Sequence, residues 1–218
     1  MFDLRVYYVL DAQAAGERDL AALAAAARRG GATAVQLRDK RGDARQTVAD
    51  ARAVAEACGD DLPLIVNDRV DVALCAHAAG VHVGSQDIHP YDARRLLGPT
   101  QIVGLSIHDA TQAAGLKAIA LDYAGVGPAF ATTTKANARA PIGPSGVGAL
   151  VAAVKAARPA LPVCAIGGID VASAGAMIAA GADGVAVASA ITAADDPEAA
   201  TAALRAAVDA ALGERAAA

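Results

Sequence analysis

Eight short apolar segments recur along this 218-residue chain, and each is separated from the next by a stretch of helical character. The apolar segments are rich in β-branched residues and nearly free of charge, as expected of strands buried on both faces of a parallel sheet. The predicted strands are 6–10, 34–37, 64–66, 80–83, 102–105, 123–126, 163–166 and 184–187. The predicted helices are about 19–29, 43–58, 69–78, 91–97, 109–116, 145–157, 170–180 and 197–212. This alternation restricts the chain to folds built from repeated strand–helix units.

Eight such units give roughly 27 residues each, close to the size of the unit in a compact (β/α)8 barrel. A doubly wound sheet shares the alternation, but eight units without a GxGxxG motif after the first strand favour the barrel. No linker separates two cores, so we expect residues 1–218 to form a single TIM-type α/β barrel domain. The longest irregular segment, about 128–144, is typical of a lid or a binding loop.

Composition argues against several classes of function. The net charge is −4 and aromatic residues make up 3% of the chain with no Trp, which disfavours a nucleic-acid partner. No apolar run is long enough to span a bilayer, and the first residues lack the pattern of a signal peptide, so no membrane partner is expected. The three cysteines fit neither a zinc site nor a disulfide framework. The sequence indicates a reduced, cytoplasmic protein acting on small molecules, and it does not indicate an oligomeric state.

Polar residues and glycines gather directly after the predicted strands, where the active site of such a barrel forms. The candidate residues are Gln36, Arg38, Lys40, Asn67, Asp68, Asp87, Ser106, Thr132, Thr134, Lys135, Gly168, Ala188 and Ser189. Arg38 and Lys40 alternate with apolar Leu37 and with Asp39, so both can point inward. A solvated turn would also explain these charges if they stood alone. Together, the cations, hydroxyls, carboxylates and glycines suit a phosphorylated substrate with a divalent cation.

Asp68 and Asp87 follow neighbouring strands and are the candidate metal ligands. Two carboxylates that leave room for water and phosphate oxygens fit Mg²⁺ better than zinc or a calcium cage. Alternatively, Asp68 caps the helix that begins near Arg69. Helix capping does not explain Asp87. Ser106 also has two possible roles: it could donate a hydrogen bond to a substrate, or it could cap the helix that follows it.

The histidines give weaker signals. His77 is expected on a helix surface, His82 in the packing of the barrel, and His108 near the barrel mouth without an acid–base partner in the sequence. No Ser/His/Asp or Cys/His set is evident, which disfavours a covalent hydrolase.

Seven segments resemble, in the same order, those of the thiamine phosphate synthase family, and together they cover nearly the whole chain. They are QLRDK, VNDRVDVAL, GVHVGSQD, GLSIHDATQA, DYAGVGPAFATTTK, PVCAIGGID and GADGVAVASAI. The resemblance implies a transferase of thiamine biosynthesis. Such an enzyme joins 4-amino-2-methyl-5-hydroxymethylpyrimidine diphosphate to a thiazole phosphate, carboxylated or not, and releases thiamine phosphate and pyrophosphate. It also implies a dissociative substitution assisted by Mg²⁺.

The same resemblance implies roles for the candidate residues. The pyrimidine diphosphate would be bound by Gln36, Arg38, Lys40, Asn67 and Lys135, with Ser106 against its diphosphate or its ring. The thiazole phosphate would be bound by Thr132, Thr134, Gly168, Ala188 and Ser189, and Mg²⁺ by Asp68 and Asp87. The residues that take part in catalysis would be Arg38, Lys40, Ser106 and Lys135. Two departures stand out: Thr133 replaces the usual proline, and the stretch from Lys135 to Gly168 is a few residues longer than usual.

Three other functions remain open at this point. A thiazole tautomerase-like relative on the same barrel would need neither the diphosphate cations nor the metal carboxylates. A Schiff-base aldolase would form an imine at Lys40 or Lys135, although imine lysines usually have apolar surroundings. A non-catalytic barrel would bind thiazole phosphate without turnover.

Overall fold

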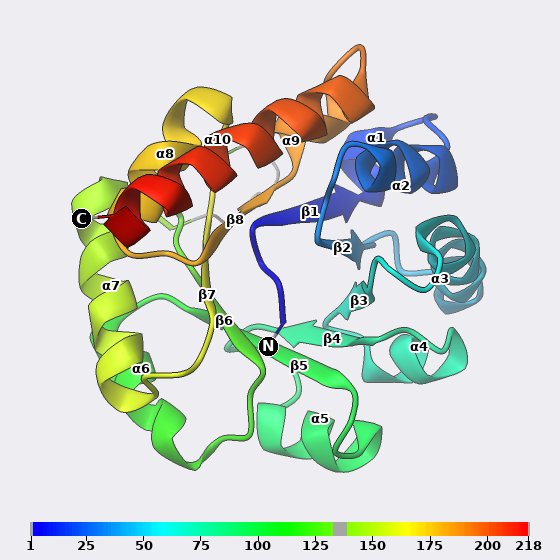
Figure 1. The fold of residues 1–218 in the computed structure, drawn as a ribbon. Coiled ribbons are helices and arrows are strands. Elements are labelled where there is room, and N and C mark those ends of the chain that lie inside the picture. Colours follow the sequence, from blue (N-terminus) through cyan, green and yellow to red (C-terminus); the bar gives the residue numbers. More distant parts are fainter. Residues whose placement is uncertain (1, 133–138, 218) are drawn as a thin grey trace.

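Eight parallel strands form a closed barrel in the order β1 to β8 (Figure 1). The structure is a computed structural model that describes residues 2–132 and 139–217. The strands are β1 (Val6–Asp11), β2 (Ala34–Arg38), β3 (Leu64–Asn67), β4 (Gly80–Val83), β5 (Ile102–Ile107), β6 (Tyr123–Val126), β7 (Val163–Ile166) and β8 (Gly184–Val187). The predicted α/β TIM-type barrel is therefore confirmed. All eight predicted strands are present, and four of them extend further toward their carboxyl ends than predicted.

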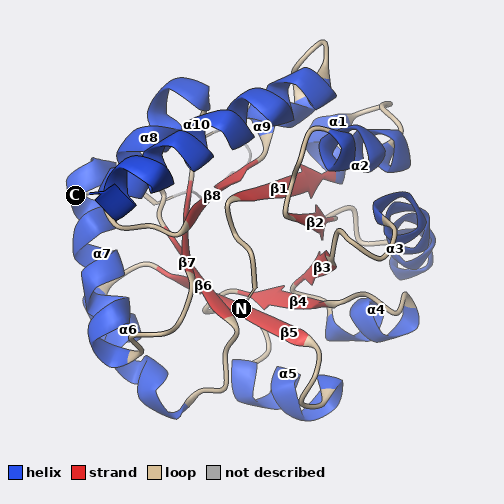
Figure 2. Ribbon diagram, viewed as in Figure 1, coloured by secondary structure: helices blue, strands red, loops and turns tan. Residues whose placement is uncertain are grey.

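Helices surround the ring of strands on its outside (Figure 2). They are α1 (Ala12–Ala15), α2 (Leu20–Arg29), α3 (Ala44–Cys58), α4 (Val70–Cys75), α5 (Pro90–Leu97), α6 (Ala110–Ala114) with the 3₁₀ turn η1 (Gly115–Ala118), α7 (Gly143–Ala157), α8 (Val171–Ala179), α9 (Ser189–Thr192) and α10 (Pro197–Ala217). The short helices α1 and α9 were not predicted. Within the described part of the chain, no helix is both long and apolar enough to cross a membrane.

Aspartates begin most of the longer helices. The carboxylates of Asp19, Asp43 and Asp170 accept backbone N–H bonds from the first turns of α2, α3 and α8. Asp196 does the same for α10, where Ala199 N donates to Asp196 Oδ1 at 3.0 Å. The start of α10 at Pro197 is thus confirmed.

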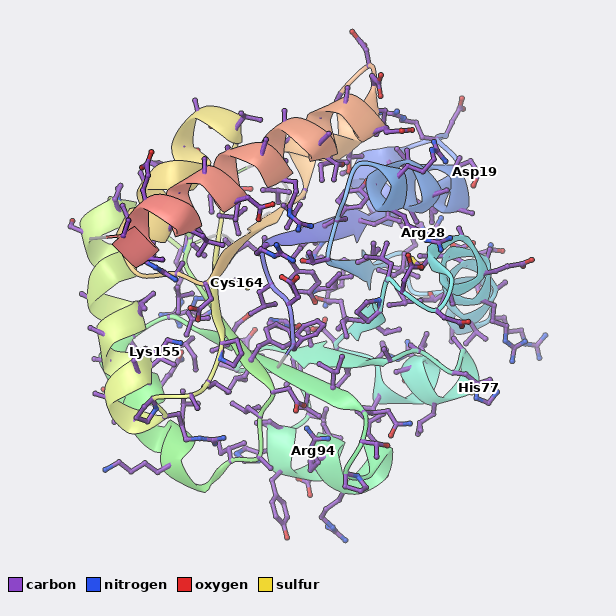
Figure 3. All side chains as sticks on the ribbon, in the orientation of Figure 1. Asp19, Arg28, His77, Arg94, Lys155 and Cys164 are labelled. Atoms are coloured by element: carbon purple, nitrogen blue, oxygen red, sulfur yellow. The ribbon has the colours of Figure 1, made fainter. Side chains whose placement is uncertain are left out.

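Alternating residues of each strand face opposite sides of the barrel wall, which produces two apolar cores. The outer core lies between strands and helices. The inner core fills the barrel with Leu4, Tyr7, Val9, Ala34, Ile65, Tyr123, Cys164 and Ala186. Figure 3 shows Cys164 inside the ring of strands. Phe2, near the amino-terminal end of the barrel, packs on the Tyr123 ring with centroids 5.2 Å apart and so adds to this inner core.

Gly104 on β5 makes room for the Tyr123 ring. A Cβ at Gly104 would lie 2.1 Å from Tyr123 Cζ. We expect Gly104→Ala to lower the free energy of unfolding by about 1–3 kcal/mol because the ring must shift in a close-packed interior. The measurement is urea denaturation. The matched control is Gly213→Ala in α10, where a Cβ meets nothing within 4 Å and helix propensity predicts a gain of about 0.5–1 kcal/mol. Equal effects of the two substitutions would contradict this account of Gly104.

Candidate active site

An ion pair joins the carboxyl ends of β1 and β2. Arg38 and Asp11 are register partners in the β1–β2 ladder, and Arg38 Nη1 donates to Asp11 Oδ2. The Asp11 side chain is 2% exposed and that of Arg38 is 15% exposed. The other carboxylate oxygen of Asp11 accepts the backbone N–H groups of Gln13 and Ala14 and so caps α1. Asp11 thereby fixes the Arg38 guanidinium to the end of the barrel wall.

Asp11→Asn tests this positioning role. Asparagine is an equally good helix cap, so α1 keeps its first turn while Arg38 loses its anionic partner. We expect the free energy of unfolding in urea to fall by about 2 kcal/mol, as for a hydrogen bond to a charged group. Asp19→Asn is the matched control, because Asp19 caps α2 in the same way. Equal losses in both variants would mean that the contact with Arg38 contributes nothing.

Lys40, Asp68 and Asp87 meet across the ends of β2, β3 and β4. Lys40 Nζ donates to Asp68 Oδ2. Asp87 Oδ2 accepts the backbone N–H of Gly84 at 2.8 Å. The pKa of Asp87 is raised, first by partial removal from water and then by the adjacent Asp68 carboxyl. Two carboxylates that follow separate strands therefore face one another beside the Lys40 ammonium group.

The backbone at Asp68 explains its orientation. Asp68 has a φ of 62°, a left-handed conformation that few non-glycine residues adopt. Its N–H donates to the carbonyl of His82 on β4 at 2.8 Å. The N-cap position of α4 is occupied by Arg69, without a side-chain cap bond. The alternative in which Asp68 caps this helix is therefore wrong, and its carboxylate is directed to Lys40 and Asp87.

Asp39, which lies between Arg38 and Lys40, has a structural role. Burial alone would raise the pKa of its carboxyl, but bonds from Arg41 and Thr47 hold that pKa below its usual range. Thr47 Oγ1 donates to Asp39 Oδ2 at 2.9 Å and Arg41 N donates to Oδ1 at 2.8 Å. Asp39 thus fixes the turn after β2, on which Lys40 lies.

Gln36 and Ser106 are connected by hydrogen bonds that pass through the interior of the barrel. Gln36 Nε2 donates to Tyr7 Oη at 2.7 Å, and Ser106 Oγ lies 2.9 Å from His82 Nε2. Tyr7 and His82 are in turn connected through the hydroxyl of Tyr123. His82 lies in the barrel interior as predicted, but it also contacts a candidate site residue. His77 is exposed, and His108 Nδ1 lies 2.9 Å from the carbonyl of Gly127.

The segment after β6 runs beside the end of β7. Ala129 N donates to Ile166 O at 2.8 Å, and Phe130 N donates to Gly167 O at 2.9 Å. Gly168 has a φ of 61°, and a Cβ there would lie 2.4 Å from the carbonyl oxygen of Ala131. Thr132 follows directly, so this segment carries Thr132 toward the glycines after β7. The predicted residues Thr134 and Lys135 lie outside the described residues, as does Thr133.

The remaining candidates also lie at strand ends. Asn67 ends β3, where it pairs in register with His82. Ala188 and Ser189 follow β8, and Ser189 is the first residue of α9. Because all eight strands are parallel, these ends lie at one face of the barrel.

Sequence reasoning missed Asp11, Tyr7 and Tyr123. Asp11 occupies the carboxyl end of the first strand, and applying the strand-end criterion to that strand would have found it. The two tyrosines carry no such signal, because they look like ordinary apolar positions of strands.

The charged groups fit a hard divalent cation with few protein ligands. Among the described residues, no cluster of three or more His, Cys, Asp or Glu has metal-binding geometry. Asp68 and Asp87 supply carboxylate oxygens, and the pKa of Asp87 is raised first by its removal from water and then by the neighbouring Asp68 carboxyl, so a cation would stabilise the charged form of both groups. Mg²⁺ is commonly held by one or two carboxylates together with waters and substrate phosphates.

Comparison with known proteins gives a consistent result. A family profile described as thiamine monophosphate synthase matches residues 6–191. The chain is 45% identical over 214 residues to the thiamine-phosphate synthase of Agrobacterium fabrum, covering 98% of this chain and 97% of that protein. It is 47% identical over 212 residues to that of a Roseiflexus species, covering 97% and 88%. A solved thiamine phosphate pyrophosphorylase from Pyrococcus furiosus superposes with a TM-score of 0.84 at 33% identity, covering 97% and 98%.

Proposed function

The chain belongs to the thiamine monophosphate synthase family, and we propose that it joins a hydroxymethylpyrimidine diphosphate to a thiazole phosphate with release of pyrophosphate. The observation that carries this proposal is the meeting of Lys40 with Asp68 and Asp87 next to the anchored Arg38. Cations and paired carboxylates side by side suit a diphosphate bound together with Mg²⁺.

In this proposal the protein acts mainly on the leaving group. Cleavage of the carbon–oxygen bond to the diphosphate leaves a methylene cation stabilised by the aminopyrimidine ring, and negative charge develops on pyrophosphate. The planar guanidinium of Arg38 binds two phosphate oxygens, and Lys40 leaves Asp68 for a phosphate oxygen when the diphosphate enters. Asp68 and Asp87 would hold Mg²⁺, which would further stabilise the charge that develops on the leaving group. No general base is needed, which agrees with the absence of a catalytic triad in the sequence.

The nucleophile comes from the other half of the barrel mouth. The thiazole nitrogen attacks the methylene carbon, so the thiazole phosphate must be held close to the pyrimidine. Two features support a thiazole phosphate site after β7 and β8. Gly168 is exposed and the segment 128–132 packs against it. Ala188 and Ser189 follow β8, the strand next to β7. Lys135, which lies outside the described residues, is proposed as a further ligand of the pyrimidine diphosphate.

The surroundings of Lys40 favour this function over the alternatives. Its side chain is 46% exposed and paired with Asp68, whereas an imine-forming lysine is usually desolvated. Sodium borohydride with a keto acid should therefore give no stable adduct. A tautomerase-like protein would have no use for the Asp68–Asp87 pair.

The experiment that tests the function combines both substrates with and without Mg²⁺. We expect pyrophosphate and thiamine phosphate to form in equal amounts and only when Mg²⁺ is present. Thiazole phosphate binding without product would indicate a binding barrel, and a covalent adduct with a keto acid would indicate an aldolase. Either outcome would overturn the proposal.

A further inference from the structure

A continuous chain of hydrogen bonds crosses the inside of the barrel from β2 to β5. Gln36 Nε2 donates to Tyr7 Oη at 2.7 Å, and Tyr7 Oη lies 2.7 Å from Tyr123 Oη. Tyr123 Oη lies 2.9 Å from His82 Nδ1, and His82 Nε2 lies 2.9 Å from Ser106 Oγ. Tyr7 and Tyr123 are at most 1% exposed and His82 is 9% exposed. The two ends of this chain, Gln36 and Ser106, are both candidate substrate ligands.

The strand register explains why the chain is unbroken. His82 pairs in register with Gly104, and Gly104 pairs with Tyr123. Because Gly104 has no side chain, the Tyr123 ring fills the space beside it, where a Cβ would lie within 2.4 Å of three ring and hydroxyl atoms. The ring thereby brings its hydroxyl between Tyr7 and His82.

The direction of the hydrogen bonds follows from the number of protons available. An amide nitrogen can only donate, so Tyr7 Oη accepts from Gln36. Burial raises the pKa of both tyrosine hydroxyls well above the usual value, so each keeps its single proton. With Gln36 as the donor, the order that gives every proton an acceptor has Tyr7 donating to Tyr123 and Tyr123 donating to Nδ1 of His82. A neutral imidazole with an accepting Nδ1 has its proton on Nε2, which in this order donates to Ser106 Oγ.

We propose that this buried relay commits Ser106 to act as a hydrogen-bond donor toward the pyrimidine diphosphate, with His82 and Tyr123 as positioning residues. Because Ser106 Oγ accepts from His82, its own proton is directed away from the relay, toward an acceptor on the substrate such as a ring nitrogen or a phosphate oxygen. The proposal rests on the proposed function for the identity of that substrate. The fixed proton positions themselves belong to the free protein.

The first test reads the proton on His82 without any substrate. We expect ¹⁵N NMR of histidine-labelled protein to show His82 as the neutral Nε2–H tautomer, with its signals assigned by their loss in His82→Gln. The Nδ1–H tautomer would reverse the direction of the relay and overturn the proposal. This result is independent of whether the protein makes thiamine phosphate, so it separates failure of the relay from failure of the proposed function.

The second test measures KM for each substrate in His82 variants. His82→Leu should raise KM for the pyrimidine diphosphate about tenfold, the effect of one well-formed hydrogen bond, and leave KM for thiazole phosphate unchanged. His82→Gln should restore most of the affinity, because its amide nitrogen replaces Nε2 as the donor. Equal losses in the two variants, or equal rises in both KM values, would show that His82 only fills space.

A double-mutant cycle decides whether His82 acts through Ser106. In a Ser106→Ala background, His82→Leu should add little to the KM for the pyrimidine diphosphate. Additive effects would contradict the relay.

Tyr123→Phe should also raise the KM for the pyrimidine diphosphate, and Tyr8→Phe is its matched control. Tyr8 is the neighbour of Tyr7 on β1, but it belongs to the outer core and its hydroxyl lies 2.8 Å from Thr192 Oγ1 on α9. A rise in this KM in Tyr8→Phe as large as in Tyr123→Phe would argue against a specific relay.

Discussion

Asp87→Asn is expected to lower kcat by about 100-fold or more while leaving the affinity for thiazole phosphate unchanged. Asparagine still accepts the backbone N–H of Gly84, which Asp87 binds at 2.8 Å, so the turn after β4 keeps its conformation. The variant loses only the charge that faces Asp68. In the proposed mechanism that charge holds Mg²⁺ against the leaving pyrophosphate, where a single stabilising group contributes about 10²–10³ to the rate. The measurement is steady-state kinetics with titrated Mg²⁺, together with calorimetric binding of thiazole phosphate.

The control for this variant is Asp71→Asn, which removes an exposed carboxylate from α4. Asp71 pairs with Arg69 Nη2 outside the site, so its loss should leave kcat unchanged. Asp87→Ala should behave like Asp87→Asn in kcat. If Asp87→Asn also loses the binding of thiazole phosphate, Asp87 maintains the structure of the barrel mouth and is not a metal ligand.

Arg38→Ala is expected to lower kcat/KM for the pyrimidine diphosphate by about 10²–10³. Arg38→Lys should recover only part of this loss, because an ammonium group keeps the charge but cannot bind two phosphate oxygens in one plane. Lysine also cannot reproduce the guanidinium contact with Asp11. The KM for thiazole phosphate should stay the same in both variants. The measurement is initial rates with each substrate varied in turn.

Arg45→Ala is the matched control for Arg38. Arg45 is exposed in the first turn of α3, seven positions along the chain from Arg38. If the diphosphate were attracted only by the positive electrostatic potential of this region, kcat/KM would fall by a similar factor in both arginine variants. A large loss confined to Arg38 supports a specific contact. Full recovery in Arg38→Lys would contradict the proposed recognition by a planar fork.

The sequence was sufficient to predict the barrel, because eight buried strands separated by helices leave few other arrangements. It was also sufficient to place Lys40, Asp68 and Asp87 at strand ends. It was not sufficient to find their contact, which depends on the left-handed backbone at Asp68. Aspartate is a common helix N-cap, and this preference suggested that the Asp68 side chain caps α4, whereas it contacts Lys40.

Other features were beyond sequence reasoning for physical reasons. Helices α1 and α9 have four residues each, too few to show a helical repeat. The contact between Tyr7 and Tyr123 joins residues 116 positions apart, and it depends on the missing side chain at Gly104. Neither tyrosine differs in pattern from an apolar strand residue, so the buried relay becomes visible only in three dimensions.

The most direct test of the central claim is a crystal structure with Mg²⁺, pyrophosphate and thiamine phosphate. The claim is that diphosphate and metal are bound after β2 to β5 and the thiazole phosphate after β6 to β8. We expect Mg²⁺ on Asp68 and Asp87, pyrophosphate on Arg38 and Lys40, and the thiazole phosphate group against Gly168 and Ser189. Two results would contradict the account. One is Mg²⁺ bound away from Asp68 and Asp87. The other is pyrophosphate bound at Gly168 while Arg38 contacts only Asp11.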